Sequence, residues 1–244
     1  ENGSINIKSL KFNGSLKQLQ ELALEKNRNL ISSEFEMKKM DWKSPLPALQ
    51  NVTGTFRLNQ GNATLHITKA HYEKQPITNV YGTINDIMTR PVLDLKVENE
   101  VAMSQFHDTL KRIFKEHPLL NSISIYENFE GIANIRLDVE GPLADFDKLA
   151  IVGQIGLKNV SLNEKGFEPR LENLEGKIYY THTPEADKRK DASWIQVIRY
   201  ENLSGSFSNS SFSNMNGELG FSNGEPLEKM SATYNFATND LQYI

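Results

Sequence analysis

Apolar and polar residues alternate with a period of two over much of this chain. From Ala133 to Val139 every second residue is apolar, and the residues between them are polar or charged. The same period recurs in three further stretches, at residues 63–67, 93–97 and 230–236. Because successive side chains of a strand point to opposite faces of its sheet, each stretch predicts a strand with one apolar face. Short polar turn clusters, such as residues 59–62 and 208–211, separate the stretches and favour antiparallel meanders over parallel crossovers.

The sequence therefore predicts a mainly β fold, a long curved antiparallel sheet with one or two short helices. The clearest helix signal lies between Ser104 and His117, where apolar residues fall at helical spacing, with Ser104 placed to cap the first turn and Pro118 to end the last. We expect this helix, over residues 104–117, to pack across the sheet or to close one end of its apolar face. A second short helix is expected over residues 17–24.

The order of glycine and proline landmarks is repeated along the chain. Four landmarks of the first half recur in the second half at offsets of 122 to 135 residues: Gly14 with Gly141, Gly54 with Gly176, Gly82 with Gly217, and Pro91 with Pro226. The second half also carries an additional polar segment at residues 183–193, which we interpret as a loop insertion. We therefore expect two β repeats, residues 1–120 ending in the helix and residues 121–244 containing the inserted loop. A repeated unit of this size stacks on its neighbour to cover its apolar face, which favours a surface or a conduit over a single compact catalytic site.

Composition narrows the possible partners. The chain has 24% charged and 38% apolar residues, as soluble proteins do, and its net charge of −4 lacks the broad basic field that binds nucleic acid. The absence of cysteine excludes disulfides, thiolate metal sites and cysteine nucleophiles. No apolar run approaches the roughly 18 to 20 residues of a membrane-spanning helix. Because the chain begins at Glu1 without a methionine, we expect a processed piece whose membrane anchor or signal peptide lies outside it.

Residue patterns for catalysis or metal binding are missing from the sequence. No two of the five histidines have metal-ligand spacing with supporting carboxylates, so all five are expected to be solvated surface residues: His66, His71, His107, His117 and His182. The nucleophile elbow, the phosphate-binding loop, the zinc-protease helix and the calcium loop are all absent. Acid pairs such as Asp138 with Glu140 project from one exposed strand face, whereas a carbohydrate hydrolase needs two carboxylates that face each other across a cleft. We therefore expect a protein that is not an enzyme, with no cofactor and no metal.

Asparagine occurs in six Asn-x-Ser/Thr triplets, at Asn13, Asn51, Asn62, Asn159, Asn202 and Asn209. In a chain this rich in asparagine and serine we expect such triplets by chance, and they do not indicate glycosylation.

The stretch of residues 45–99 resembles the repeating unit of the AsmA-like proteins of the Gram-negative envelope, in particular the YhdP type. The residues that carry the resemblance are Pro45, Leu49, Val52, Gly54, Leu65, Ile67, Tyr72, Pro76, Ile77, Gly82, Pro91, Leu93 and Leu95. The second half supplies Pro169, Leu171, Leu174, Gly176, Ile195, Val197, Phe212, Gly217 and Pro226. It departs from the pattern at Gly205 and Ser206, which fall where Tyr72 would be matched.

The resemblance implies a periplasmic part of an inner-membrane-anchored protein, folded as a repeating β-groove of the bridge-like lipid-transfer superfamily. It implies a lipid-binding or lipid-conducting role in intermembrane lipid transport or outer-membrane homeostasis, in which phospholipid acyl chains lie along an apolar groove. Each buried methylene contributes about 0.8 kcal/mol, so acyl chains need a long apolar track to leave a bilayer. The residues expected to line this groove are Leu65, Ile67, Leu95, Val97, Ile135, Leu137, Val139, Met230, Tyr234 and Phe236.

A second interpretation stays open at this point, because antiparallel sheets with one apolar face normally bury that face against protein. Under it, the chain is a structural or assembly module, a β-sandwich with a closed core whose edge strands or helix bind another envelope protein. The expected partners are thus a phospholipid or another acyl-chain lipid and, beside it, other envelope proteins. Contact with the membrane is expected through an anchor outside this fragment.

Overall fold

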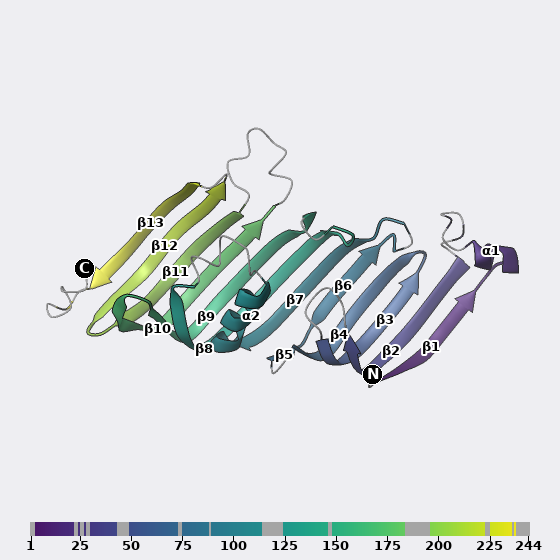
Figure 1. Cartoon of the computed structure of the whole chain (residues 1–244), viewed down its shortest axis with the longest axis horizontal. Coiled ribbons are helices and arrows are strands. Elements are labelled where there is room, and N and C mark those ends of the chain that lie inside the picture. The colour runs from purple at the N-terminus through teal and green to yellow at the C-terminus, as the bar shows by residue number, and fades with distance from the viewer. Residues whose placement is uncertain are drawn as a thin grey trace. The chain divides into compact units, whose positions relative to one another are not determined.

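The computed structural model describes most of the chain: residues 3–21, 24, 27, 30–42, 49–72, 75–87, 89–113, 124–145, 148–183, 196–222, 225–235 and 237. These residues form thirteen strands and two helices (Figure 1). The strands are β1 (Ser4–Phe12), β2 (Ile31–Trp42), β3 (Leu49–Asn59), β4 (Asn62–Tyr72), β5 (Gln75–Ile77), β6 (Val80–Asn85), β7 (Val92–Ala102), β8 (Tyr126–Pro142), β9 (Ala150–Glu164), β10 (Phe167–His182), β11 (Gln196–Phe207), β12 (Ser210–Ser222) and β13 (Glu225–Asn235). The helices are α1 (Leu16–Gln20) and α2 (Met103–Ile113).

All thirteen strands belong to one open sheet, and neighbours in the sheet are neighbours in the chain. The hydrogen-bonded order is β1-β2-β3-β4-β6-β7-β8-β9-β10-β11-β12-β13, and the short β5 pairs with β4 beside this path. Every pair of strands whose register is defined is antiparallel. The prediction of a mainly β fold with an open antiparallel sheet and two short helices is confirmed. The described strands do not form the two stacked sheets of a sandwich.

Both helices overlap the predicted ranges, but α1 is shorter than the expected 17–24, because it ends at Gln20 and the described Glu21 and Leu24 are not helical. α1 begins after a capping box, in which the Ser15 side chain accepts from the Gln18 N–H and the Gln18 side chain accepts from the Ser15 N–H. α2 begins at Met103, one residue before the predicted start, and is described as far as Ile113. Residues 114–117 of the predicted helix, residues 184–193 of the predicted insertion, and Phe236 lie outside the described residues.

Most of the long strands contain one non-glycine residue with left-handed backbone. The residues concerned have φ between 48° and 53° and lie one to a strand in β2, β3, β8, β9, β10, β11 and β12: Lys39, Asn51, Asn128, Asn159, Asn173, Asn202 and Asn214. The pairing register shifts at the five of these positions for which it is defined, and we interpret all seven as β-bulges because they share the same backbone conformation. Asparagine tolerates this backbone better than other residues with a side chain, which explains its place in six of the seven bulges.

Five of the seven bulges lie in a four-residue sequence motif: asparagine, an apolar residue, any residue, then glycine. It occurs at residues 51–54, 79–82, 128–131, 173–176, 202–205 and 214–217. The apolar residue of the motif points into the core, and Val52 is completely buried. The glycine packs against the neighbouring strand: a Cβ on Gly131 would lie 2.5 Å from the Asn159 carbonyl oxygen. The bulge at Asn159 of β9 thus lies against a glycine of the preceding strand β8, and bulges of this kind bend a sheet.

Polar side chains accept hydrogen bonds from backbone N–H groups of bulge residues. The Asp41 carboxylate accepts from the Asn51 N–H at 3.2 Å, and the Asn216 side-chain oxygen accepts from the Asn202 N–H at 3.0 Å. Both acceptors stand two residues after the bulge residue of the neighbouring strand. Because unpaired backbone groups are costly, these side chains stabilise the bulged backbone.

The chain divides into two compact units. Unit 1 comprises residues 1–99 and 137–151, and unit 2 comprises residues 100–136 and 152–244. Each has its own apolar core, built on Met37, Val52, Ile67, Ala70 and Val80 in unit 1 and on Val101, Met103, Ala133, Val160, Leu162 and Leu174 in unit 2. This division differs from the repeats expected at 1–120 and 121–244, because α2 groups with unit 2 and the second half of β8 groups with unit 1.

Replacing the motif glycine Gly131 by alanine should lower the free energy of unfolding by about 2–4 kcal/mol, since the new Cβ meets the Asn159 carbonyl and φ is +95°. Gly166 is the matched control, because its φ is +87° and a Cβ there meets nothing within 4 Å. Gly166→Ala should cost only about 1 kcal/mol. Urea unfolding followed by circular dichroism measures both values. Equal losses would show that the close approach of the strands contributes nothing.

Candidate functional site

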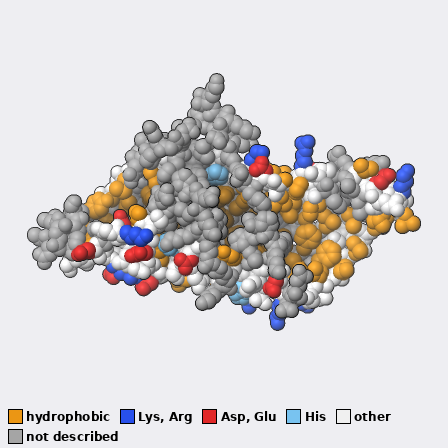
Figure 2. All heavy atoms as spheres, in the orientation of Figure 1, with side chains coloured by type: hydrophobic (Ala, Val, Ile, Leu, Met, Phe, Trp, Pro, Cys, Tyr) orange, Lys and Arg blue, Asp and Glu red, His pale blue; other side chains and the backbone are white. Residues whose placement is uncertain are grey.

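The apolar face of unit 1 is the first candidate site. Its side chains form three ranks that run across β1, β2, β3, β4, β6 and β7: Ile5–Met37–Gly54–Ile67–Val80–Val97, Ile7–Phe35–Phe56–Leu65–Gly82–Leu95 and Leu10–Ser33–Leu58–Ala63–Ile84–Leu93. Because directly opposed residues of antiparallel strands share a face, each rank lies on one side of the sheet. The predicted residues Leu65, Ile67, Leu95 and Val97 lie together in these ranks. Figure 2 shows the apolar side chains gathered over β1–β4.

Burial on this face falls from the middle strands towards the edge strand β1. Ile67 is 2% exposed, whereas Ile7 and Leu10 of β1 are 63% and 61% exposed. Among the described strands β1 pairs with β2 alone, so in this part of the chain the two side chains have a neighbouring strand on one side only. The outer part of the face thus offers apolar surface to a ligand or partner, whereas its inner part is packed core.

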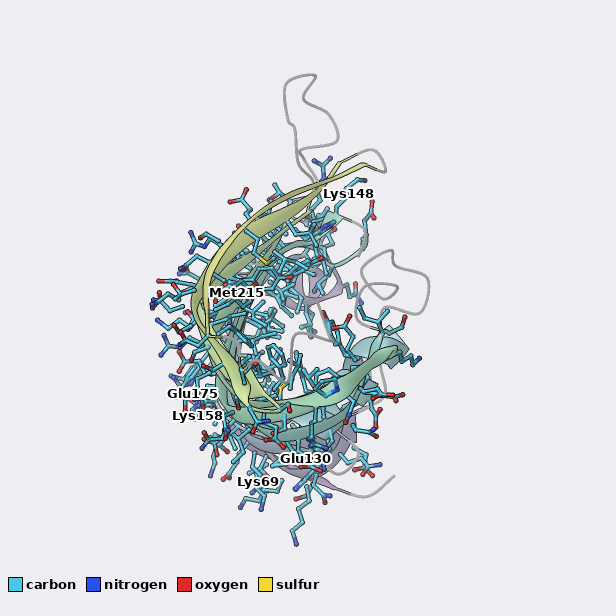
Figure 3. The ribbon with its side chains drawn as sticks, turned by 90° about the vertical axis from the view of Figure 1, so that its left-hand side faces the viewer. Lys69, Glu130, Lys148, Lys158, Glu175 and Met215 are labelled. Carbon is cyan, nitrogen blue, oxygen red and sulfur yellow. The ribbon has the colours of Figure 1, made fainter. Side chains whose placement is uncertain are left out.

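In unit 2 the apolar face is formed by strands β8, β9, β10 and β12 together with α2, and β13 extends it. Met230 of β13 is opposed by Gly217, and Tyr234 by Phe212, at 6.4 Å between the ring centroids. Phe212 packs against the core of unit 2, so the predicted Met230 and Tyr234 lie on the core side of the sheet. Both are about half exposed. Figure 3 shows Met215 on the inner side of the bent strands, and Glu130, Lys158 and Glu175 on the outer side.

α2 covers part of this face. Met103 and His107 are buried, Phe106 packs against the core, and the His107 ring lies 4.2 Å from the ring of Phe129 in β8. The expectation that all histidines are solvated is therefore wrong for His107, which is 6% exposed. It stands three residues after Ser104, on the face of α2 that turns towards the sheet, and the sequence alone does not show that face to be covered at this point.

The predicted residues of β8 alternate as expected. Ile135, Leu137 and Val139 are half-buried, while Asp138 and Glu140 between and beyond them are exposed. Ile135 packs against the core of unit 2. Leu137 and Val139 belong to unit 1 by their contacts. The predicted set of groove residues is therefore divided between two units, and contact of any of them with lipid stays a prediction.

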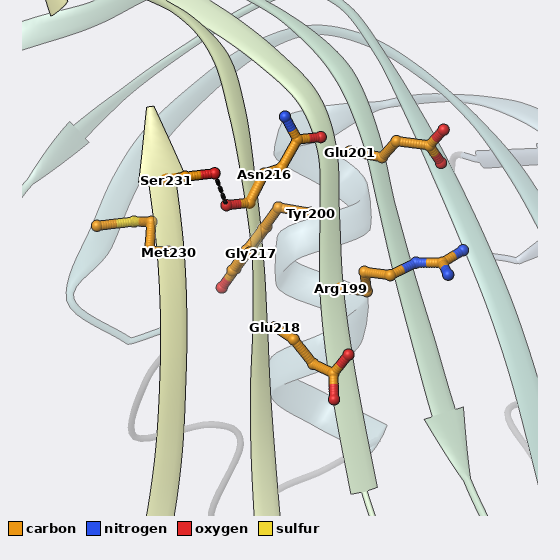
Figure 4. Close-up of a pocket in the computed structure, with 8 residues that line it drawn as sticks. All are labelled: Arg199, Tyr200, Glu201, Asn216, Gly217, Glu218, Met230 and Ser231. Carbon is orange, nitrogen blue, oxygen red and sulfur yellow. Dashed lines mark hydrogen bonds between the residues drawn. The ribbon is translucent and has the colours of Figure 1, made fainter. Parts of the chain in front are cut away.

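Unit 2 also contains a shallow depression of about 500 Å³ on β11–β13, lined mostly by polar side chains together with Tyr200 and Met230 (Figure 4). Its polar groups already bind one another: the Ser231 hydroxyl donates to the Asn216 carbonyl, and Arg199 lies over the Tyr179 ring at 4.5 Å. The hydrogen bond with Glu201 raises the pKa of Tyr179. We interpret the depression as a consequence of the bulges at Asn202 and Asn214, which part the side chains there.

Three of the six Asn-x-Ser/Thr triplets have a structural explanation. Asn51, Asn159 and Asn202 are bulge residues with positive φ, and in the motif copies at 51–54 and 202–205 the Thr or Ser lies at the position that accepts any residue. The bulge motif is not among the features predicted from the sequence, although its signal is present in the chain as six copies of the four-residue pattern. Nor are Ile5, Ile7 and Leu10, because the bulge between Ile7 and Ser9 interrupts the alternation of β1.

Comparison with protein-family models, with curated proteins and with solved structures gave no match. Among the described residues, no three histidine or acidic side chains are grouped so that they could hold a metal ion. No helix in the described ranges is long and apolar enough to span a bilayer.

The titration of Tyr180 tests whether its side chain is buried on the apolar face of unit 2. Tyr180 lies in β10 opposite Ile198, and burial raises its pKa to about 12, from about 10 in an unfolded chain. Since the folded state binds this proton more tightly, the stability that it confers is complete below pH 10 and is lost as the pH rises towards 12. We expect Tyr180→Phe to reduce the fall in the free energy of unfolding across this range, as measured by urea unfolding at several alkaline pH values. Identical slopes for the two proteins would contradict the burial of the phenol.

Proposed function

We propose that this protein is a non-enzymatic lipid-binding domain whose apolar sheet faces hold the acyl chains of phospholipids or similar lipids. The observation that carries the proposal is the continuous apolar face of unit 1, which extends over six strands and is left largely exposed at β1. A soluble domain rarely keeps large exposed apolar side chains side by side unless they contact a ligand or a partner.

The dimensions of this face suit an acyl chain. Six strands at roughly 4.8 Å spacing give an apolar path of about 24 Å across unit 1, whereas one leaflet of a bilayer has roughly 15 Å of hydrocarbon. A chain of that length can therefore lie along a rank while its headgroup stays in water beyond the sheet edge. Each methylene so buried contributes about 0.8 kcal/mol, which favours a long path over a small pocket.

Under this proposal the domain is part of a periplasmic, inner-membrane-anchored protein of the AsmA-like type, with a role in intermembrane lipid transport or outer-membrane homeostasis. The support is the order of glycine, proline and apolar landmarks in residues 45–99 and its repetition in the second half. The open antiparallel sheet with one apolar face is the architecture that such a role needs.

A second candidate function has its own observation in favour. β1 is the end strand of the sheet that the described residues form, and Ile5, Ile7 and Leu10 are exposed on it. A strand of another envelope protein could add to this edge, as in an assembly module. Such a partner would cover the same apolar residues, so lipid and protein binding must be measured separately.

The first experiment is extraction of the purified protein with organic solvent and mass spectrometry of the extract. We expect phospholipid or another acyl-chain lipid at a stoichiometric level. Protein prepared without lipid should then bind a phospholipid that carries an NBD fluorophore, with a rise in fluorescence as the probe enters an apolar site. Absence of lipid in the extract together with no probe binding would refute the proposal.

The double variant Ile5→Glu, Ile7→Glu should weaken binding of the NBD-labelled phospholipid at least about tenfold, because carboxylates placed on the apolar face oppose burial of the acyl chain. Its stability should change little, since both side chains are more than half exposed. Ser4→Glu is the matched control on the same strand: the new acid is on the polar face, opposite Lys38. Unchanged binding in the double variant would exclude the β1 end of unit 1 as the lipid site.

A further inference from the structure

Exposed leucines are concentrated just after β1. Leu16 and Leu19 of α1 are 80% and 41% exposed, and Leu24, beyond the helix, is 46% exposed. Residues three apart on a helix lie on the same face, so Leu16 and Leu19 project together. We name Leu16, Leu19 and Leu24 the leucine corner. None of the residues of α1 is buried, so the helix contributes no side chain to the core of unit 1.

The segment that presents these leucines is nevertheless held by specific bonds. The capping box at Ser15 fixes the start of α1. Asn27 is 1% exposed, and its side-chain amide donates to the Glu21 carbonyl while its N–H donates to the Leu24 carbonyl. The Asn13 N–H donates to the Leu30 carbonyl and closes the segment at its base. An isolated five-residue helix is not stable by itself, so these bonds preserve a shape that exposes the leucines.

The stretch of sequence that contains the leucine corner differs in charge from the whole chain. Residues 11–28 contain four basic and two acidic residues, although the protein carries a net charge of −4: the basic ones are Lys11, Lys17, Lys26 and Arg28, and the acidic ones Glu21 and Glu25. Lys11 and Lys17 are exposed. Exposed leucines flanked by basic residues are the composition that binds the interface of anionic bilayers.

We propose that the leucine corner docks unit 1 on an anionic phospholipid bilayer, so that acyl chains pass between the bilayer and the apolar face at β1. The second part rests on the proposed function, whereas the docking itself does not. Leu10, which is the exposed β1 end of the third apolar rank, and Leu16 are only six residues apart, on either side of the turn at Asn13 and Gly14. The surface that would enter the bilayer thus continues directly into the strand that carries the exposed ranks.

A protein strand on the free edge of β1 accounts for fewer of these features. Strand addition would use the backbone of β1 and cover Ile5, Ile7 and Leu10. It requires neither exposed leucines on α1 nor basic residues around them. The leucine corner together with its basic flank therefore favours a bilayer.

Vesicle flotation tests the docking. The full chain should float with vesicles of phosphatidylethanolamine and phosphatidylglycerol, and much less with vesicles of phosphatidylcholine alone. Leu16→Ser with Leu19→Ser should lower the bound fraction at least about tenfold, because two apolar side chains no longer leave water. Tyr81→Ser is the matched control, since Tyr81 is 52% exposed on the polar face of unit 1 and its loss should leave flotation unchanged.

Charge reversal tests the basic flank. Lys11→Glu with Lys17→Glu should weaken binding to the phosphatidylglycerol vesicles, and added salt should weaken binding of the wild-type protein in the same way. Circular dichroism of each variant checks the fold, which the high exposure of the substituted side chains should leave intact.

The outcomes separate docking from lipid binding. Loss of flotation in the leucine variant, with NBD-phospholipid binding retained in the absence of vesicles, supports the docking surface. Flotation that depends on the leucines would support the docking surface even if the NBD probe failed to bind. The failed probe binding would then count against the proposed function alone. No flotation of the wild-type chain, equal flotation of the leucine variant, or a dimer in sedimentation that the leucine variant abolishes would overturn it.

Discussion

The structure depends on one close backbone contact, in which the bulge of one strand lies against a glycine of its neighbour. At Gly131 and Gly176 the approach leaves no room for a Cβ, and the carbonyl oxygens of Asn159 and Asn202 occupy that space. The bulge restores the alternation of faces after an extra residue, so the next apolar side chain, such as Val160 or Leu203, returns to the core side. Repetition of this contact bends the strands while it keeps the apolar and polar faces separate.

One face of the sheet is apolar and unfavourable to expose to water, and the two units cover that face to different degrees. Unit 2 covers part of its apolar face with α2, through Met103, Phe106 and His107. In unit 1 the apolar ranks extend to β1, where Ile5, Ile7 and Leu10 are largely exposed. On the polar face of unit 1 the charges pair across strands, as Arg57 does with Glu34 at 3.2 Å, and such exposed pairs add little stability. The proposed lipid binding depends on this difference between the two faces and on the exposed apolar side chains of β1.

The sequence was informative wherever a property depends on neighbouring residues along the chain. Alternation identified the strands around Leu65, Leu95, Ile135 and Met230, and spacing identified α2 to within one residue of its start. Alternation failed where a bulge shifts it, which is why the exposed apolar positions of β1 were missed. His107 was misjudged because its burial depends on Phe129 of β8, a residue that is distant in the chain.

By itself, the sequence determined the order of the strands, the apolar identity of one face and the places where glycine and asparagine permit a bulge, because these follow from local spacing and backbone preference. Only the tertiary structure decided which apolar residues are core and which are exposed. Ile67 and Ile7 look alike in the sequence, but Ile67 has strands on both sides and Ile7 has a strand on one side only. Burial is set by the number of neighbouring strands, a property that no local pattern of residues encodes.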